Sequence, residues 1–120
     1  NLDSLGRAVR SVVGFESRGT LGLWTTGEFA VVSLSEPVLH THLLHLKLSA
    51  TPDLVGNSVF FSLGAERIEV PIRASNQLFD ITLQFANADL ASDLVIDLPI
   101  GLESSVPGSL QVTDLIIEKP

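Results

Sequence analysis

Apolar and polar residues alternate with a period of two along much of this chain, and this pattern constrains the fold more than any other feature. In one segment Ile68, Val70 and Ile72 alternate with charged residues or proline. The same alternation recurs over residues 44–49 and 79–85. Successive side chains of a β-strand point to opposite faces, so a strand with one buried face has this pattern. The sequence therefore predicts an all-β fold.

Segments rich in proline and glycine separate the alternating stretches, because proline cannot donate a hydrogen bond to a central strand ladder. Gly64 lies between two apolar runs and can adopt the positive φ of a hairpin turn. A short segment, residues 87–93, is compatible with helix but too short for more than one turn. We predict about eight strands and a closing ninth, with uncertain boundaries, near residues 7–15, 21–25, 28–34, 40–49, 57–63, 66–73, 77–85, 93–98 and 110–118.

Two antiparallel sheets packed face to face would bury the alternating apolar positions of these strands. The expected fold is a two-sheet antiparallel β-sandwich, with jelly-roll topology preferred and immunoglobulin-like topology second. The length of 120 residues predicts a single domain over residues 1–120. Because the chain starts at Asn1 and contains no methionine, we expect it to be a piece of a longer protein.

The balance of charge narrows the choice of partners. The chain has fourteen acidic residues and seven lysines and arginines, so its net charge is −7. Nucleic acid and anionic membrane surfaces bind basic patches, so neither is an expected partner. The apolar runs 59–61 and 94–96 are too short to cross a bilayer, so no membrane insertion by this segment is expected. The absence of cysteine excludes disulfides and thiolate metal sites.

His40 and His42 are the first candidates for chemistry. On a strand they would share one face, which is the spacing that allows two imidazoles to bind one metal ion. A cupin site adds a glutamate farther along the same strand, but residues 46–48 are Leu-Lys-Leu here, and His45 has the opposite parity. We therefore favour polar strand residues near a sheet edge over a degenerate cupin-like metal protein, and we expect no bound metal at this pair.

Enzyme chemistry has little support in the sequence. Nucleophile elbows, phosphate-binding glycine loops and paired-histidine helix motifs are all absent. The carboxylates fall mostly at positions that alternate with apolar residues, which is typical of a solvated strand face. We expect no enzyme activity and no cofactor. A structural calcium ion is an alternative, because loop oxygens could come from Asp53, Asn57, Asp89 and Asp93.

Trp24 is the only tryptophan in the chain. An exposed indole can stack on a sugar ring, whereas a buried one belongs to the core of the sandwich. The residues alone leave both readings open and favour the core. The exposure of Trp24 therefore separates a sugar-binding domain from a purely structural one.

The order of several motifs resembles a known type of domain. Gly14-Phe15, Gly22-Leu23-Trp24-Thr25, Glu36-Pro37 and the strand 44–50 follow one another at characteristic distances. This order resembles that in the C-terminal β-sandwich domain of some bacterial membrane sugar and phosphoglycerol transferases. That domain is itself similar to carbohydrate-binding modules. The likeness covers most of the chain. The glutamate expected three residues before Gly22 is replaced by Gly19, and an Asp-x-Arg-x-Leu-Gly stretch expected before the last strand is missing.

The resemblance implies a non-catalytic accessory module that binds or orients a bacterial envelope glycan. It also implies an extracytoplasmic location, periplasmic or on the cell surface, and attachment to a larger parent protein. The expected contact residues are Glu16, Arg18, Trp24, His40 and His42. The alternative is a structural or assembly domain that binds only protein.

Overall fold

The computed structural model describes residues 8–16, 22–87, 90–98 and 109–119. These residues form an all-β sandwich, as predicted, and none of them belongs to a helix long and apolar enough to cross a membrane. The elements are β1 (Val9–Val13), β2 (Phe15–Glu16), β3 (Leu23–Thr25), β4 (Phe29–Leu34), β5 (Leu43–Ala50), the 3-10 turn η2 (Pro52–Leu54), β6 (Ser58–Leu63), β7 (Glu66–Pro71), β8 (Phe79–Leu83), β9 (Asp93–Asp97) and β10 (Leu110–Glu118).

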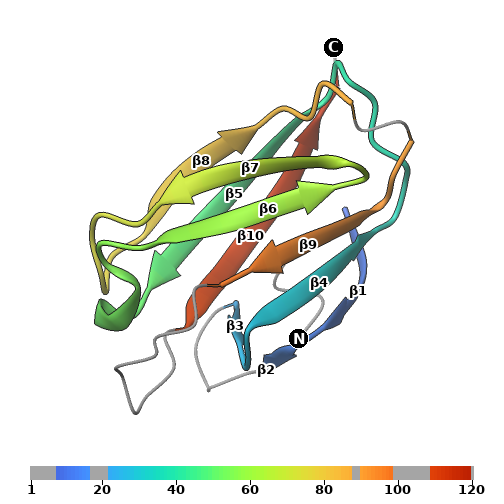
Figure 1. The fold of residues 1–120 in the computed structure, drawn as a ribbon. Helices are drawn as coiled ribbons and strands as arrows, with labels where there is room; N and C mark the ends of the chain where they lie inside the picture. The colour runs from blue at the N-terminus through green and yellow to red at the C-terminus, as the bar shows by residue number, and fades with distance from the viewer. Residues whose placement is uncertain (1–7, 17–21, 88–89, 99–108, 120) are drawn as a thin grey trace.

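The strands form two five-stranded antiparallel sheets that pack face to face (Figure 1). One sheet has the order β1-β4-β9-β6-β7 and the other has the order β2-β3-β10-β5-β8. The long strands β5 and β10 pair along most of their length at the centre of the second sheet. The sandwich is thus established, and jelly-roll topology stays a prediction.

The core lies between the sheets and consists of the inward positions of the alternating strands. Leu44, Leu46 and Leu48 of β5 are 0–2% exposed, as their spacing predicts. The largest fully buried side chains are Phe61 and Phe85. The burial of apolar surface in such a core is the main favourable contribution to the free energy of folding. The hairpin between β6 and β7 turns at Gly64, which has the predicted positive φ of 62°.

Gly14 divides the first predicted strand in two. We predicted one strand over residues 7–15, but β1 belongs to one sheet and β2 to the other. Gly14 has a φ of 83°, and a Cβ atom there would lie 2.8 Å from the Phe29 carbonyl oxygen. Only glycine tolerates both the left-handed conformation and this close approach. The glycine therefore allows the chain to change sheets within one residue.

Another predicted boundary also changes. The strand expected from residue 40 begins at Leu43, because residues 39–42 form a turn in which the His42 amide donates to the Leu39 carbonyl at 3.0 Å. In the segment considered for helix, Asn87 lies in a turn, residues 88–89 fall outside the described part of the chain, and β9 begins at Asp93.

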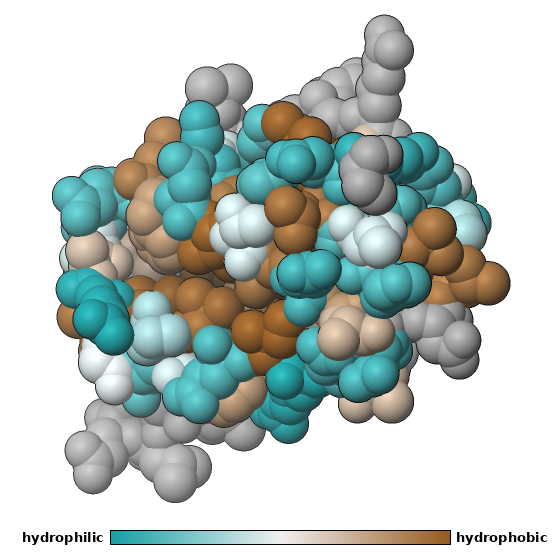
Figure 2. Space-filling model, turned by 90° about the horizontal axis from the view of Figure 1, so that it is seen from above, coloured by the Kyte–Doolittle hydropathy of each residue, from teal (hydrophilic) through white to brown (hydrophobic). Residues whose placement is uncertain are grey.

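The sandwich is incompletely closed along the edge formed by β7 and β8, which Figure 1 places uppermost. The inward-facing Ile68 of β7 and Phe79 and Ile81 of β8 are only partly buried. Seen from above, apolar residues gather in a hollow that polar residues border (Figure 2). The outward positions of β7 carry Arg67, Glu69 and Pro71. Charged residues and proline at an exposed edge oppose pairing with a further strand.

Candidate functional site: a polar and aromatic row on one sheet

Strand β3 carries Trp24, and the residues before it explain how the side chain is placed. Gly22 has a φ of 81°, and a Cβ atom there would lie 2.5 Å from the Val112 carbonyl oxygen of β10. Glycine is therefore required for β3 to enter the sheet beside β10. Leu23 and Thr25 are buried, whereas Trp24 between them is half-buried. By strand alternation, Trp24 faces the outer side of its sheet and does not belong to the core.

Thr25 ties β3 to the start of β10. Its hydroxyl accepts a hydrogen bond from the Leu110 amide at 2.9 Å, and its carbonyl accepts one from the Ser109 hydroxyl at 2.8 Å. The Ser109 amide in turn donates to the Thr51 hydroxyl at 2.9 Å. Thr25 and Ser109 are both buried, so these bonds satisfy groups that water cannot reach. In the Gly-x-Trp-Thr motif, Gly22 and Thr25 thus have structural roles, and Trp24 is the member that faces the outer side of the sheet.

The register of the sheet aligns four side chains in one row across its outer face. Glu16 of β2 is paired with Trp24, Trp24 is paired with Gln111 of β10, and Gln111 is paired with Ser49 of β5. Residues paired directly across antiparallel strands have Cβ atoms about 5 Å apart, close enough for their side chains to interact. The row runs over four strands of the sheet and is called the Trp24 row below.

Gln111 and Ser49 are unusual members of an outer face because they are only 8% and 6% exposed. Their neighbours along each strand, such as Leu110 and Leu48, are fully buried on the core side. Sequence reasoning missed both residues. Single polar residues in alternating strands look like ordinary solvated positions, and only the pairing of β10 with β3 and β5 brings them to Trp24.

The Trp24 row combines the groups that bind sugars. The indole has an apolar face for stacking and an N–H donor. The Gln111 amide both donates and accepts hydrogen bonds, the Ser49 hydroxyl does the same, and the Glu16 carboxylate accepts. Sugar hydroxyls need such donors and acceptors beside a flat apolar surface.

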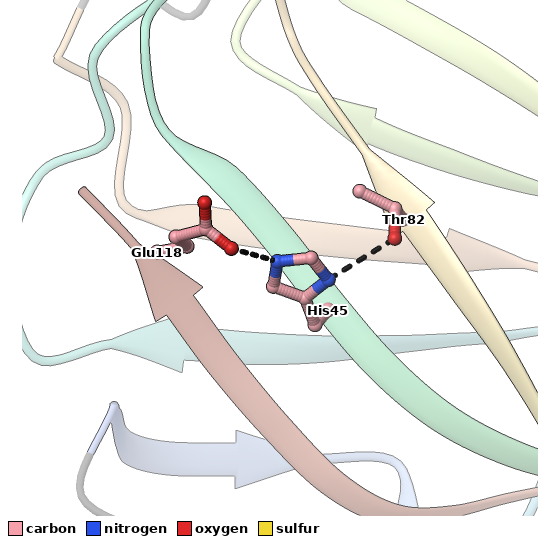
Figure 3. A network of polar contacts seen from close by, with 3 residues as sticks. All are labelled: His45, Thr82 and Glu118. Atoms are coloured by element: carbon pink, nitrogen blue, oxygen red, sulfur yellow. Dashed lines mark hydrogen bonds and ion pairs between the residues drawn. The ribbon is translucent and has the colours of Figure 1, made fainter. Parts of the chain in front are cut away.

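A second polar group lies farther along the same face, where His45 of β5 bridges its two neighbouring strands (Figure 3). His45 Nδ1 lies 3.0 Å from the Thr82 hydroxyl of β8, and Nε2 lies 2.8 Å from a carboxylate oxygen of Glu118 of β10. Sequence reasoning set His45 aside because its parity differs from that of the other two histidines. The structure shows that this parity places it on the outer face, with partners at both ring nitrogens.

The two histidines proposed from the sequence do not share a strand face. His40 is exposed in the turn before β5, whereas His42 is only 6% exposed. His42 Nδ1 accepts a hydrogen bond from the Leu39 amide at 3.1 Å. This bond closes the turn and gives His42 a structural role. The expectation that both residues lie on one strand was wrong, because the turn replaces the start of the strand.

The remaining site predictions have different outcomes. Glu16 lies in the Trp24 row, as described above, whereas Arg18 falls outside the described residues. Of the calcium candidates, Asp53 lies in η2, Asn57 donates to the Asp53 carbonyl at 3.3 Å, and Asp93 accepts from the Ser33 hydroxyl at 2.9 Å. Asp89 is outside the described residues. Within the described part of the chain, no three His, Asp or Glu side chains gather closely enough to hold a metal ion.

A cavity of about 610 Å³ opens beside His40, away from the Trp24 row. Its lining is mostly small or apolar and comes from three connecting segments, with Leu39, His40, Gly64, Ala65, Ala86, Asn87, Leu90 and Ala91. Apart from His40 and Asn87, these side chains bring no polar group that could orient a ligand. The cavity therefore offers less specific recognition than the Trp24 row.

Comparisons with protein-family models, with curated proteins and with solved structures found no match to this chain. The resemblance described from the motifs therefore stays a prediction, and the function must be argued from the geometry of the site.

Proposed function

We propose that this domain is a non-catalytic accessory module that binds or orients a bacterial envelope glycan on the outer face of the sheet β2-β3-β10-β5-β8. The observation that carries the proposal is the Trp24 row. A half-buried indole is paired in register with a carboxylate on one side and with an amide on the other. Under the same proposal the domain lies outside the cytoplasm as part of a larger envelope protein, a placement that rests on the motif resemblance.

The half-buried state of Trp24 suits a stacking residue. Neighbours that hold the ring reduce the conformational entropy lost on binding, and the exposed part supplies contact area for the sugar. The burial of Gln111 restrains its amide in a similar way. A sugar ring over Trp24 would lie beside the exposed carboxylate of Glu16, with the Gln111 amide beneath its other side.

The test is a titration followed by tryptophan fluorescence, which reports on Trp24 alone because the chain has no other tryptophan. Soluble oligosaccharides prepared from bacterial envelopes would be screened as separate fractions. We expect an emission between those of a buried and a free indole, partly quenched by iodide, and a shift or protection by one class of glycan.

Variants then locate the binding. Trp24→Ala should weaken binding about tenfold, which corresponds to about 1.4 kcal/mol, as measured by calorimetry. The matched control is Phe29→Ala, which removes an exposed aromatic residue from β4 in the other sheet. Trp24→Phe should retain part of the affinity and also guards against misfolding of the alanine variant. The proposal fails if every fraction leaves the emission unchanged, or if Trp24→Ala binds as tightly as the parent.

The second candidate is an assembly domain that binds only protein. The incompletely closed edge at Ile68, Phe79 and Ile81 favours it, because partly exposed apolar residues gather at protein interfaces. Binding of a protein partner that is lost on Ile81→Asp and kept in Trp24→Ala would support this alternative.

A further inference from the structure

The charges around the Trp24 row suggest which kind of glycan it accepts. Glu16 is paired directly with Trp24 at one end of the row. On β10, Asp114 is the next outward-facing residue beyond Gln111, after an irregularity in the pairing between Val112 and Asp114. Carboxylates therefore lie on the face on two sides of the indole and the amide.

The rest of this outer face carries more negative than positive charge. Lys47 of β5 is paired with Asp114 on one side and with Asp80 of β8 on the other. Glu118 lies at the far end of β10 beside His45. Among the described outward-facing strand residues of this sheet, the acidic ones are Glu16, Asp80, Asp114 and Glu118, and the one lysine or arginine is Lys47.

The molecule as a whole adds to this local field. Its net charge of −7 gives a negative background potential, which repels anionic ligands and attracts cationic ones. The charges of the described outward-facing residues of this sheet and the background potential act in the same direction. Asp114 is half-buried, so its charge is screened less than that of a fully exposed carboxylate.

We infer that the Trp24 row selects sugars that carry a free amine over neutral sugars, and neutral sugars over anionic ones. The protonated amine donates to the carboxylate of Glu16 or Asp114 while the ring stacks on Trp24. Phosphate or carboxylate groups on a glycan would meet like charges at the same positions. The inference rests on the proposed function, because it names the glycan class for that same site.

The test uses three tetrasaccharides with one backbone, β-1,4-linked glucosamine, in the free-amine, N-acetyl and N-succinyl forms. At a mildly acidic pH, which protonates the sugar amines and leaves the carboxylates ionised, they are cationic, neutral and anionic, respectively. Each is titrated while Trp24 emission is recorded. At low salt we expect the amine form to bind at least about fivefold more tightly than the N-acetyl form, with the N-succinyl form weakest. The differences should shrink as NaCl is raised from about 20 mM to about 500 mM.

Two variants and a control separate the local carboxylates from the general charge of the protein. Glu16→Gln and Asp114→Asn should each reduce the preference for the amine form by about half or more at low salt. Glu69→Gln changes the net charge equally, but Glu69 lies exposed on β7 in the other sheet, so the preference should stay the same. Trp24→Ala has no tryptophan left, so its binding is measured by calorimetry, and it should weaken binding of the amine and N-acetyl forms together.

The outcomes distinguish the two proposals. Equal binding of the three forms, or tighter binding of the N-succinyl form, overturns the inference about charge. If Trp24→Ala still weakens binding in that case, the proposed glycan site is kept. If Glu69→Gln reduces binding of the amine form as much as Glu16→Gln does, the inference about charge is also overturned, because the effect would come from net charge alone. If none of the three sugars changes Trp24 emission, the inference about charge is overturned, whereas the proposed function is decided by the separate screen of envelope fractions.

Discussion

Substitution of Gly22 by alanine tests how tightly β3 is held against β10, on which the position of Trp24 depends. The added Cβ atom would lie 2.5 Å from the Val112 carbonyl oxygen and 2.8 Å from the Thr113 Cα atom. Both are backbone atoms of a central strand and cannot turn aside. The φ of 81° is also unfavourable for any residue with a side chain. Gly22→Ala therefore combines two separate costs.

The two costs can be given magnitudes. The left-handed conformation costs a residue other than glycine about 1 to 2 kcal/mol. A forced shift of packed neighbours costs about 1 to 3 kcal/mol. We therefore expect Gly22→Ala to lower the free energy of unfolding by about 2 to 5 kcal/mol, a large share of the stability of an ordinary domain.

Two other glycines separate these costs. Gly56 has a φ of 88° with nothing within 4 Å of an added Cβ atom, so Gly56→Ala should show the conformational cost alone, about 1 to 2 kcal/mol. Gly27 has open space and no positive φ, so Gly27→Ala should change stability by less than about 0.5 kcal/mol. Urea unfolding followed by Trp24 fluorescence and by circular dichroism measures all three.

The order expected is Gly22→Ala, then Gly56→Ala, then Gly27→Ala, from most to least destabilising. If Gly22→Ala were no more harmful than Gly56→Ala, the close approach of β3 to β10 would be refuted. The pairing of Trp24 with Gln111 would then lose its support. A fall in the iodide protection of Trp24 in Gly22→Ala, without loss of the sheet signal in circular dichroism, would locate the disturbance in β3.

Two further predictions concern the hydrogen bonds of the same sheet. Thr25→Val should destabilise the domain by about 1 to 3 kcal/mol in urea unfolding, because the buried Leu110 amide loses its acceptor. Thr25→Ser keeps the hydroxyl and should be much milder. Equal effects of the two variants would assign the loss of stability to packing. Glu118→Gln should change the free energy of unfolding by less than about 1 kcal/mol, because its contact with His45 is exposed to solvent. A larger change that persists at high salt would contradict this.

The fold class and the inward face of most strands followed from the sequence because alternation is local. Leu44, Leu46 and Leu48 are buried together as their spacing required, and Gly64 forms the hairpin turn that it marked. The same locality caused the errors. Periodicity shows that residues 7–15 are extended, but it does not show that the chain changes sheets at Gly14. It also does not reveal that the hydrogen bond between Leu39 and His42 closes a turn before β5.

By itself, the sequence determined that this chain forms strands, which side chains of most strands face inward, and that Trp24 is its only indole. Which strands pair, and in which register, was decided by the tertiary structure. Thr25 and Ser109 meet across 84 residues of chain, and the same pairing of β3 with β10 places Gln111 beside Trp24. Such contacts depend on how both sheets pack over a shared core, because a shift of one residue would turn every side chain of a strand to the other face.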